Sequence, residues 1–122
     1  MTRVMIVDDE VNFAQNTARL LHENDGDMEV FPVFSAEEAL ERLEASPVDI
    51  IVTDIRLPLM NGITFMEIVK NRWPRTALIV MTAFGAKEVI VESLSLGSLF
   101  YIEKPFRIEK LENVIKMTRM KK

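Results

Sequence analysis

The 122-residue sequence predicts a doubly wound α/β domain, because two patterns alternate along it. Five short apolar runs occupy residues 4–7, 28–33, 50–52, 77–81 and 99–102. Segments with apolar residues at helical spacing lie between these runs and after the last one. This strand–helix alternation is typical of a parallel sheet with right-handed crossovers and with helices on both faces.

The strands are predicted from the apolar runs. Four of the five runs are continuous, as in strands that are buried on both faces of a parallel sheet. The run at residues 28–33 differs because it contains Pro32. Proline has no N–H group to donate to a sheet ladder, so we expect the second strand to lie at an edge of the sheet.

The helices are predicted from apolar or small residues spaced three and four positions apart. In chain order, the five sets are Val11, Ala14, Ala18 and Leu21; Ala36, Ala39, Leu40 and Leu43; Phe65, Ile68 and Val69; Ile90, Ser93, Leu94 and Gly97; and Leu111, Val114, Ile115 and Thr118. Ser35 and Glu38 have the spacing of a capping box, in which Ser35 caps the second helix and Glu38 reaches back to the Ser35 N–H.

Length and composition indicate one domain over residues 1–122 and exclude several functions. Hydrophobic residues make up 48% and charged residues 28% of the chain, which excludes intrinsic disorder. With no cysteine and one histidine, the chain has little to offer a thiolate metal site or a Ser-His triad. The net charge of −4 argues against nucleic-acid binding. We expect a cytosolic protein, because neither a membrane-spanning run nor a signal-peptide layout is present.

Polar residues follow four of the predicted strands, where ligands bind in open parallel sheets. They are Asp8, Asp9 and Glu10 after the first strand, Asp54 after the third, Thr82 after the fourth, and Lys104 and Pro105 after the fifth. Each residue alone is an ordinary loop or cap residue. If the first and third strands are neighbours, however, the three aspartates converge.

Three neighbouring carboxylates repel one another unless a cation lies between them. Oxygen ligands without histidine or cysteine favour magnesium, with manganese or calcium as alternatives. Lys104 would add a second positive charge, and Thr82 a hydroxyl donor. This combination suits a phosphate-like group. The chain has no glycine-rich phosphate loop, so we do not expect the phosphoryl group to belong to a bound nucleotide.

Together these segments resemble the receiver domains of bacterial two-component response regulators. The resemblance rests on residues 4–10, 54–58, 61–62, 81–83, 97 and 101–106, and it covers essentially the whole chain. It implies a flavodoxin-like, five-stranded parallel sheet in the order 2-1-3-4-5. It also implies that Asp54 accepts a phosphoryl group from a histidine kinase or a phosphotransfer protein.

The resemblance implies further roles around Asp54. Mg²⁺ is held by Asp8, Asp9, Asp54 and the backbone carbonyl of Arg56. Lys104 and the Thr82 hydroxyl bind phosphoryl oxygens, and Tyr101 turns inward when the hydroxyl moves. Pro58 and Gly62 shape the loop after Asp54. We expect a cis bond at Pro105, because the chain must reverse sharply there to aim Lys104 back at the site.

The sequence argues against two other functions. A flavodoxin-like domain that binds flavin or nucleotide needs a phosphate-binding loop after the first strand, where Asp8, Asp9 and Glu10 would repel a phosphate. A phosphohydrolase with an aspartyl nucleophile often has an acid two residues later, where this chain has Arg56.

The output is open to two interpretations. Residues 81–85 resemble receivers joined to ATPase-type transcriptional activators, and stand-alone phosphorelay regulators have similar segments. Residues 89–96 carry more apolar side chains than one buried stripe needs. We therefore expect the face formed by the fourth helix, the fifth strand and the fifth helix to mediate dimerisation or partner docking upon phosphorylation.

Overall fold

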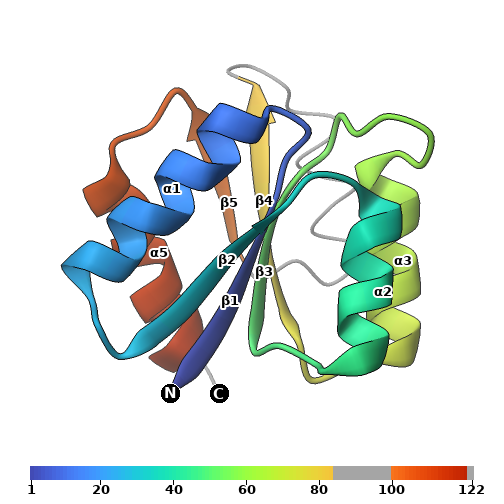
Figure 1. Cartoon of the computed structure of the whole chain (residues 1–122), viewed down its shortest axis with the longest axis horizontal. Helices are drawn as coiled ribbons and strands as arrows, with labels where there is room; N and C mark the ends of the chain where they lie inside the picture. The colour runs from blue at the N-terminus through green and yellow to red at the C-terminus, as the bar shows by residue number, and fades with distance from the viewer. Residues whose placement is uncertain (84–99, 121–122) are drawn as a thin grey trace.

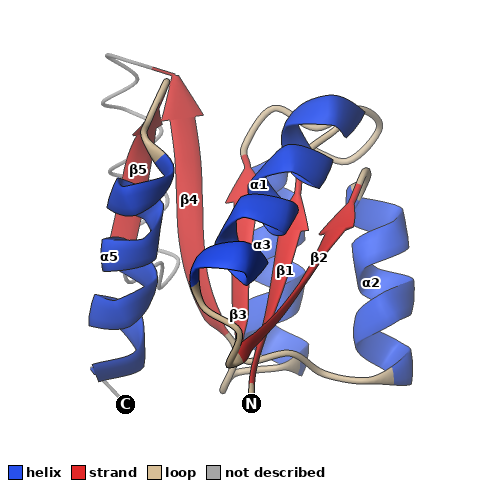
Figure 2. Ribbon diagram, turned by 60° about the vertical axis from the view of Figure 1, so that its left-hand side comes forward, coloured by secondary structure: helices blue, strands red, loops and turns tan. Residues whose placement is uncertain are grey.

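The computed structural model describes residues 1–83 and 100–120. These ranges contain five strands, β1 (Thr2–Val7), β2 (Met28–Val33), β3 (Ile50–Asp54), β4 (Ala77–Ala83) and β5 (Phe100–Lys104). All pair in parallel, in the order β2-β1-β3-β4-β5, and their arrows point the same way in Figure 2. The predicted α/β class and strand order are confirmed.

The helices of the described ranges are α1 (Val11–Asn24), α2 (Ala36–Ala45), α3 (Gly62–Arg72) and α5 (Ile108–Met120). The helix predicted around residues 90–97 lies outside the described residues. Figure 1 shows α1 and α5 on one face of the sheet and α2 and α3 on the other. Within the described ranges, no helix has the length and apolar character needed to cross a membrane.

The sheet has a hydrophobic core on each face, because successive side chains of a strand point to opposite sides. Val4 and Ile6 belong to the cluster that includes buried residues of α1 and α5. Met5 and Val7 belong to the cluster that includes buried residues of α2 and α3. All four β1 residues are fully buried, so β1 anchors the three layers.

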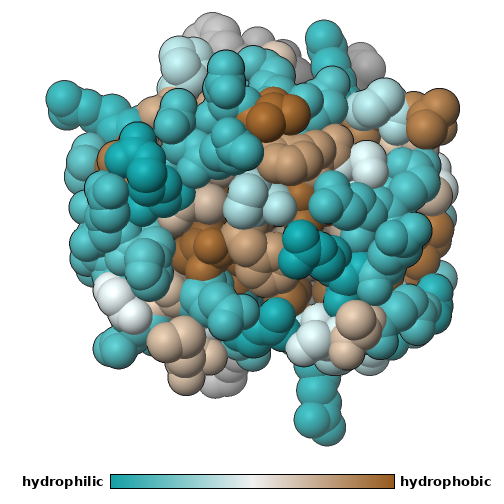
Figure 3. All heavy atoms as spheres, in the orientation of Figure 1, coloured by the Kyte–Doolittle hydropathy of each residue, from teal (hydrophilic) through white to brown (hydrophobic). Residues whose placement is uncertain are grey.

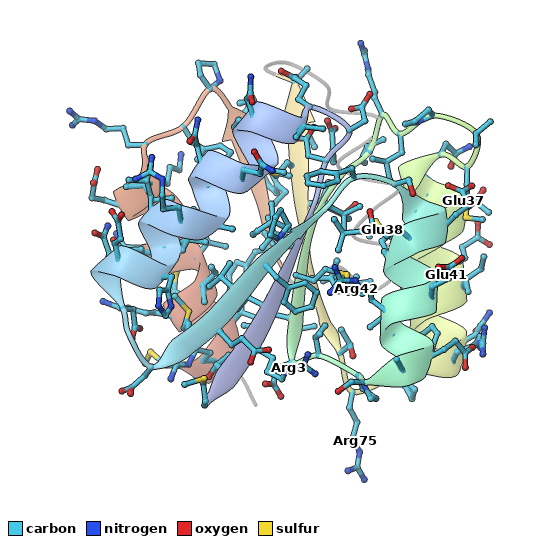
Figure 4. All side chains as sticks on the ribbon, in the orientation of Figure 1. Arg3, Glu37, Glu38, Glu41, Arg42 and Arg75 are labelled. Carbon is cyan, nitrogen blue, oxygen red and sulfur yellow. The ribbon has the colours of Figure 1, made fainter. Side chains whose placement is uncertain are left out.

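The predicted edge position of β2 is confirmed. In Figure 3, apolar side chains gather in the middle of the face shown, and hydrophilic side chains surround them. Phe31 of β2 is partly buried, and the guanidinium groups of Arg3 and Arg42 lie 5.6 and 5.4 Å from its ring centre. Figure 4 labels both arginines, which lie between the sheet and α2. These cation–π contacts cover an edge aromatic that the sheet leaves partly exposed.

The start of α2 agrees with one half of the predicted capping box. The Ser35 Oγ accepts a hydrogen bond from the Glu38 N–H at 3.1 Å, as predicted. The Glu38 carboxylate accepts instead from the Phe34 N–H, at 3.0 Å. The prediction that Glu38 bonds the Ser35 N–H is therefore wrong, since the glutamate side chain is long enough to reach the donor one residue earlier.

Candidate functional site

The carboxyl ends of β1, β3, β4 and β5 meet at one edge of the sheet. Asp8 and Asp9 directly follow β1, and Asp54 and Lys104 are the last residues of β3 and β5. Thr82 is the penultimate residue of β4. The structure thus brings together the five polar residues that the sequence placed at separate strand ends.

The three aspartates form a cluster. One carboxylate oxygen from each of Asp8, Asp9 and Asp54 lies within 4.8 Å of the others. Asp8 is fully buried, Asp9 is exposed, and the Asp54 side chain is 16% exposed. Backbone N–H groups orient two of them: Glu10 donates to Asp8 Oδ1 at 2.9 Å, and Arg56 donates to Asp54 Oδ1 at 3.1 Å. The cluster offers the carboxylate oxygen donors that a hard divalent cation prefers.

Lys104 joins two of these carboxylates. Its ammonium nitrogen lies 2.6 Å from Asp8 Oδ2 and 3.1 Å from Asp54 Oδ2. Burial by itself would lower the pKa of Lys104, but the hydrogen bond to Asp8 and the charge of Asp54 outweigh it. The pKa of Lys104 is therefore raised above its ordinary value of 10.5. Lys104 is thus a permanent cation at neutral pH, held between two strands.

Thr82 contributes a hydroxyl without a hydrogen-bond partner among the described residues. The residue is only 2% exposed, and in the part of the chain that the structure describes its Oγ1 has no hydrogen-bond partner. A buried polar atom without a partner costs about 1–3 kcal/mol. Thr82 lines the same pocket as Asp54 and Lys104. Its hydroxyl is therefore available to a ligand in that pocket.

The pocket has a volume of about 520 Å³. Besides polar groups it is lined by two aromatic rings to which the sequence pattern assigned no role at the site, those of Phe13 from α1 and Phe106 from the segment after β5. The two rings meet edge to face, with their centres 5.9 Å apart. Phe13 lies four residues after Asp9, near the start of α1, so its position close to the site could have been inferred from the strand–helix order.

The loop after Asp54 depends on the absence of a side chain at Gly62. A Cβ atom there would lie 2.5 Å from the Ile55 Cα, and the Gly62 N–H donates to the Ile55 carbonyl at 2.7 Å. This close approach ties the start of α3 to the end of β3. At the tip of the loop, Leu59 is 96% exposed and has a left-handed backbone with φ of 67°.

The remaining predicted site residues lie at different distances from the cluster. The Lys104–Pro105 peptide bond is cis, as predicted. Arg56 lines the pocket, while the metal-binding role of its carbonyl stays a prediction. Pro58 lies in the loop after β3, where its carbonyl accepts from the Met60 N–H at 2.7 Å. Tyr101 is not brought to the pocket: it lies in β5 and is 42% exposed.

Solved structures of similar fold are receiver domains. A CheY-like receiver domain protein from Methanospirillum hungatei is 30% identical, with a TM-score of 0.88 over 96% of this chain and 92% of that one. The receiver domain of NtrX from Brucella abortus is 26% identical, with a TM-score of 0.86 over 94% of this chain and 96% of that one.

Curated relatives are longer regulators. The hydrogenase transcriptional regulatory protein HoxA of Bradyrhizobium diazoefficiens is 31% identical over 114 residues, which are 93% of this chain and 23% of HoxA. The regulatory protein AtoC of Escherichia coli is 32% identical over 117 residues, which are 94% of this chain and 24% of AtoC. The chain thus spans about a quarter of the length of these relatives.

Residues 4–116 match the family of response regulator receiver domains, and this match includes every residue of the aspartate cluster, Thr82 and Lys104. The geometry at the carboxyl ends of the strands and the family match point to the same conclusion. The chain belongs to the response regulator receiver domains of two-component signalling.

Proposed function

We propose that the chain is a switch that is turned on by phosphorylation of Asp54. The observation that carries the proposal is the position of Lys104, whose ammonium bridges Asp8 and Asp54 from a third strand. The Asp54 carboxylate is partly exposed and shares its pocket with this fixed cation and with the Thr82 hydroxyl, which has no partner among the described residues. A carboxylate in such surroundings is equipped to accept a phosphoryl group.

The proposed step is an in-line transfer. An Asp54 carboxylate oxygen attacks the phosphorus of a phosphohistidine on a histidine kinase or a phosphotransfer protein. The O–P bond forms as the N–P bond breaks, and the electron pair stays on the imidazole, which then takes up a proton. Lys104 neutralises charge on one phosphoryl oxygen, and the Thr82 hydroxyl donates to another. Positioning and charge neutralisation of this kind account for most of the catalysis of phosphoryl transfer.

Mg²⁺ is the proposed cofactor. Asp8, Asp9, Asp54 and the carbonyl of Arg56 would hold it, and carboxylate oxygens with no histidine or cysteine nearby fit this ion. When bound, Mg²⁺ neutralises negative charge on the carboxylates and on the transferred phosphoryl group. The chain itself supplies the fixed oxygen donors, two of them oriented by backbone N–H groups.

The proposed switch connects this site to the surface of β5 and α5. The acyl phosphate would draw the Thr82 hydroxyl toward it, and Tyr101 would turn inward from its exposed position. Met117 of α5 is 45% exposed and Met120 83% exposed. This surface, with the segment that contains the predicted fourth helix, is the proposed site of phosphorylation-dependent homodimerisation or partner docking.

The proposed context is a cytoplasmic transcriptional regulator of which residues 1–122 are the single receiver domain. HoxA and AtoC support this context, because both are named as regulators and are about four times as long as this chain. A protein-glutamate methylesterase of Anaeromyxobacter dehalogenans is also 32% identical over 106 residues. Similarity in this region therefore does not by itself specify the output.

The test is intact-mass measurement after incubation with acetyl phosphate and Mg²⁺. We expect the wild type to gain one phosphoryl group and the Asp54→Asn variant to gain none. Asp27→Asn is the matched control, because it removes an exposed carboxylate outside the site and should be labelled like the wild type. Equal labelling of wild type and Asp54→Asn would disprove the assignment.

A further inference from the structure

We propose that Phe13 is a positioning residue that holds the ammonium group of Lys104 at the phosphoacceptor site. The inference rests on the proposed function, in which Lys104 binds a phosphoryl oxygen. Phe13 belongs to α1 and Lys104 to β5, so the contact joins segments that are about 90 residues apart in the chain.

The contact is close and its geometry is favourable. The Lys104 nitrogen lies 4.4 Å from the centre of the Phe13 ring, well inside the range of about 6 Å in which a cation is attracted to an aromatic face. An ammonium group has three N–H donors. Two hydrogen bonds from this group go to Asp8 and Asp54. The ring therefore provides a third contact for an ammonium group that the two carboxylates hold only in part.

A third contact matters because a lysine side chain is long and flexible. Its four-carbon stem loses much of its rotamer freedom when it is fixed, and this loss opposes the ordered position. Phosphorylation of Asp54 would exchange the Lys104–Asp54 contact for a contact with a phosphoryl oxygen. The Phe13 ring does not take part in that exchange, so it can keep the ammonium group in place while the partner changes.

The ring is itself held in position. Phe13 packs against the core cluster between the sheet and the helices α1 and α5, and it meets Phe106 edge to face at 5.9 Å and 82°. Both rings line the pocket beside Asp54. They therefore form an apolar wall around the Lys104 charge, and lower local polarity strengthens its attraction to carboxylate or phosphoryl oxygens.

A purely structural role of Phe13 would lead to a different result on substitution. If Phe13 only filled space, leucine would replace it with little effect on the site, because the apolar volume is largely kept. If its aromatic face holds Lys104, leucine should fail and tyrosine should succeed. Phe13→Leu and Phe13→Tyr therefore separate the two roles.

The experiment follows the rate of labelling by acetyl phosphate and the ¹⁵N NMR signal of the Lys104 ammonium group. We expect Phe13→Leu to be labelled about fivefold more slowly, within the range of a partly desolvated cation–π contact, and Phe13→Tyr to keep the wild-type rate. The Lys104 ammonium signal should be resolved in wild type and Phe13→Tyr and should broaden in Phe13→Leu. Urea unfolding of each variant verifies that it is folded.

Phe31→Leu is the matched control, because it removes a ring that contacts Arg3 and Arg42 away from the pocket. It should leave the labelling rate and the Lys104 signal unchanged. Equal rates and equal Lys104 signals in Phe13→Leu and Phe13→Tyr would overturn the inference about Phe13. A wild type that takes no label would instead overturn the proposed function, and the Lys104 signal would still decide whether Phe13 holds this side chain.

Discussion

The amino and carboxyl ends of the strands differ in how their charged side chains are paired. At the amino ends, Arg3 donates to Glu29, to the Ser46 hydroxyl and to the Pro47 carbonyl at 2.6–2.8 Å. One cation thus has one carboxylate partner and two neutral acceptors. At the carboxyl ends, three carboxylates lie together, and within the described residues Lys104 is the cation that forms ion pairs with them.

The two ends also differ in the solvent exposure of their carboxylates. The Glu29 side chain is 51% exposed, whereas Asp8 is fully buried. The Arg3–Glu29 ion pair is therefore partly solvated and contributes only modestly to stability. Among the described residues, the carboxyl end has more negative charge than Lys104 neutralises. Such an excess favours a cation from outside, and the cation and Lys104 together would offset the charge of a phosphoryl group.

The largest expected contrast comes from removing the central cation at each end. Lys104→Met leaves a fully buried carboxylate without its partner, and in EDTA we expect it to lower the free energy of unfolding by about 2–3 kcal/mol. The loss is smaller than for a fully buried pair because the Lys104 side chain is 21% exposed. Arg3→Met should cost about 1 kcal/mol or less. Urea denaturation measures both, and a greater loss for Arg3→Met would contradict the comparison.

A second contrast concerns the glycines of the two ends. Gly62→Ala places a Cβ atom 2.5 Å from the Ile55 Cα, and we expect a loss of about 2 kcal/mol, in the range of overpacking. Gly26 lies between α1 and β2, and a Cβ atom there would have nothing within 4 Å. Gly26→Ala should change the free energy of unfolding by less than about 0.5 kcal/mol. Thermal denaturation of both variants tests this contrast. A loss of stability in Gly62→Ala as small as that in Gly26→Ala would show that the loop after Asp54 tolerates a side chain.

A smaller contrast appears at alkaline pH. Because the pKa of Lys104 is raised above 10.5, its ion pairs contribute fully below that pH and are lost as the pH rises through the folded-state value. The stability difference between wild type and Lys104→Met should therefore be constant up to about pH 10 and shrink above it. The difference between wild type and Arg3→Met should not change, since arginine keeps its charge. A Lys104 difference that stays constant to pH 12 would contradict this account.

Some parts of the fold and of the site could be predicted from the sequence. Short apolar runs predicted the strands, and Pro32 predicted the edge strand. Both are properties of the local sequence, because a run of apolar residues and a missing N–H group depend on no distant contact. The convergence of Asp8, Asp54 and Lys104 followed from the rule that parallel strands end at the same edge. Strand order itself came from the family resemblance, since periodicity does not specify which strands are neighbours.

Other features depended on tertiary contacts that no local pattern encodes. The cation–π contact of Phe13 with Lys104 requires the packing of α1 beside the end of β5. The Glu38 side chain accepts from the Phe34 N–H, one residue before the donor that the sequence signature indicated. The lack of a partner for the Thr82 hydroxyl among the described residues depends on the packing around β4, which the local sequence does not specify.

The most direct test of the central claim is the effect of Mg²⁺ on the unfolding of wild type and Asp9→Asn. Without Mg²⁺ we expect Asp9→Asn to be the more stable protein, because one of three neighbouring like charges is gone. With Mg²⁺ at ten times its Kd for the wild type, the wild type should gain about 1.4 kcal/mol by mass action. Asp9→Asn should gain much less, and the control Asp27→Asn should gain as much as the wild type. An equal gain in wild type and Asp9→Asn, or no gain in the wild type, would contradict the account.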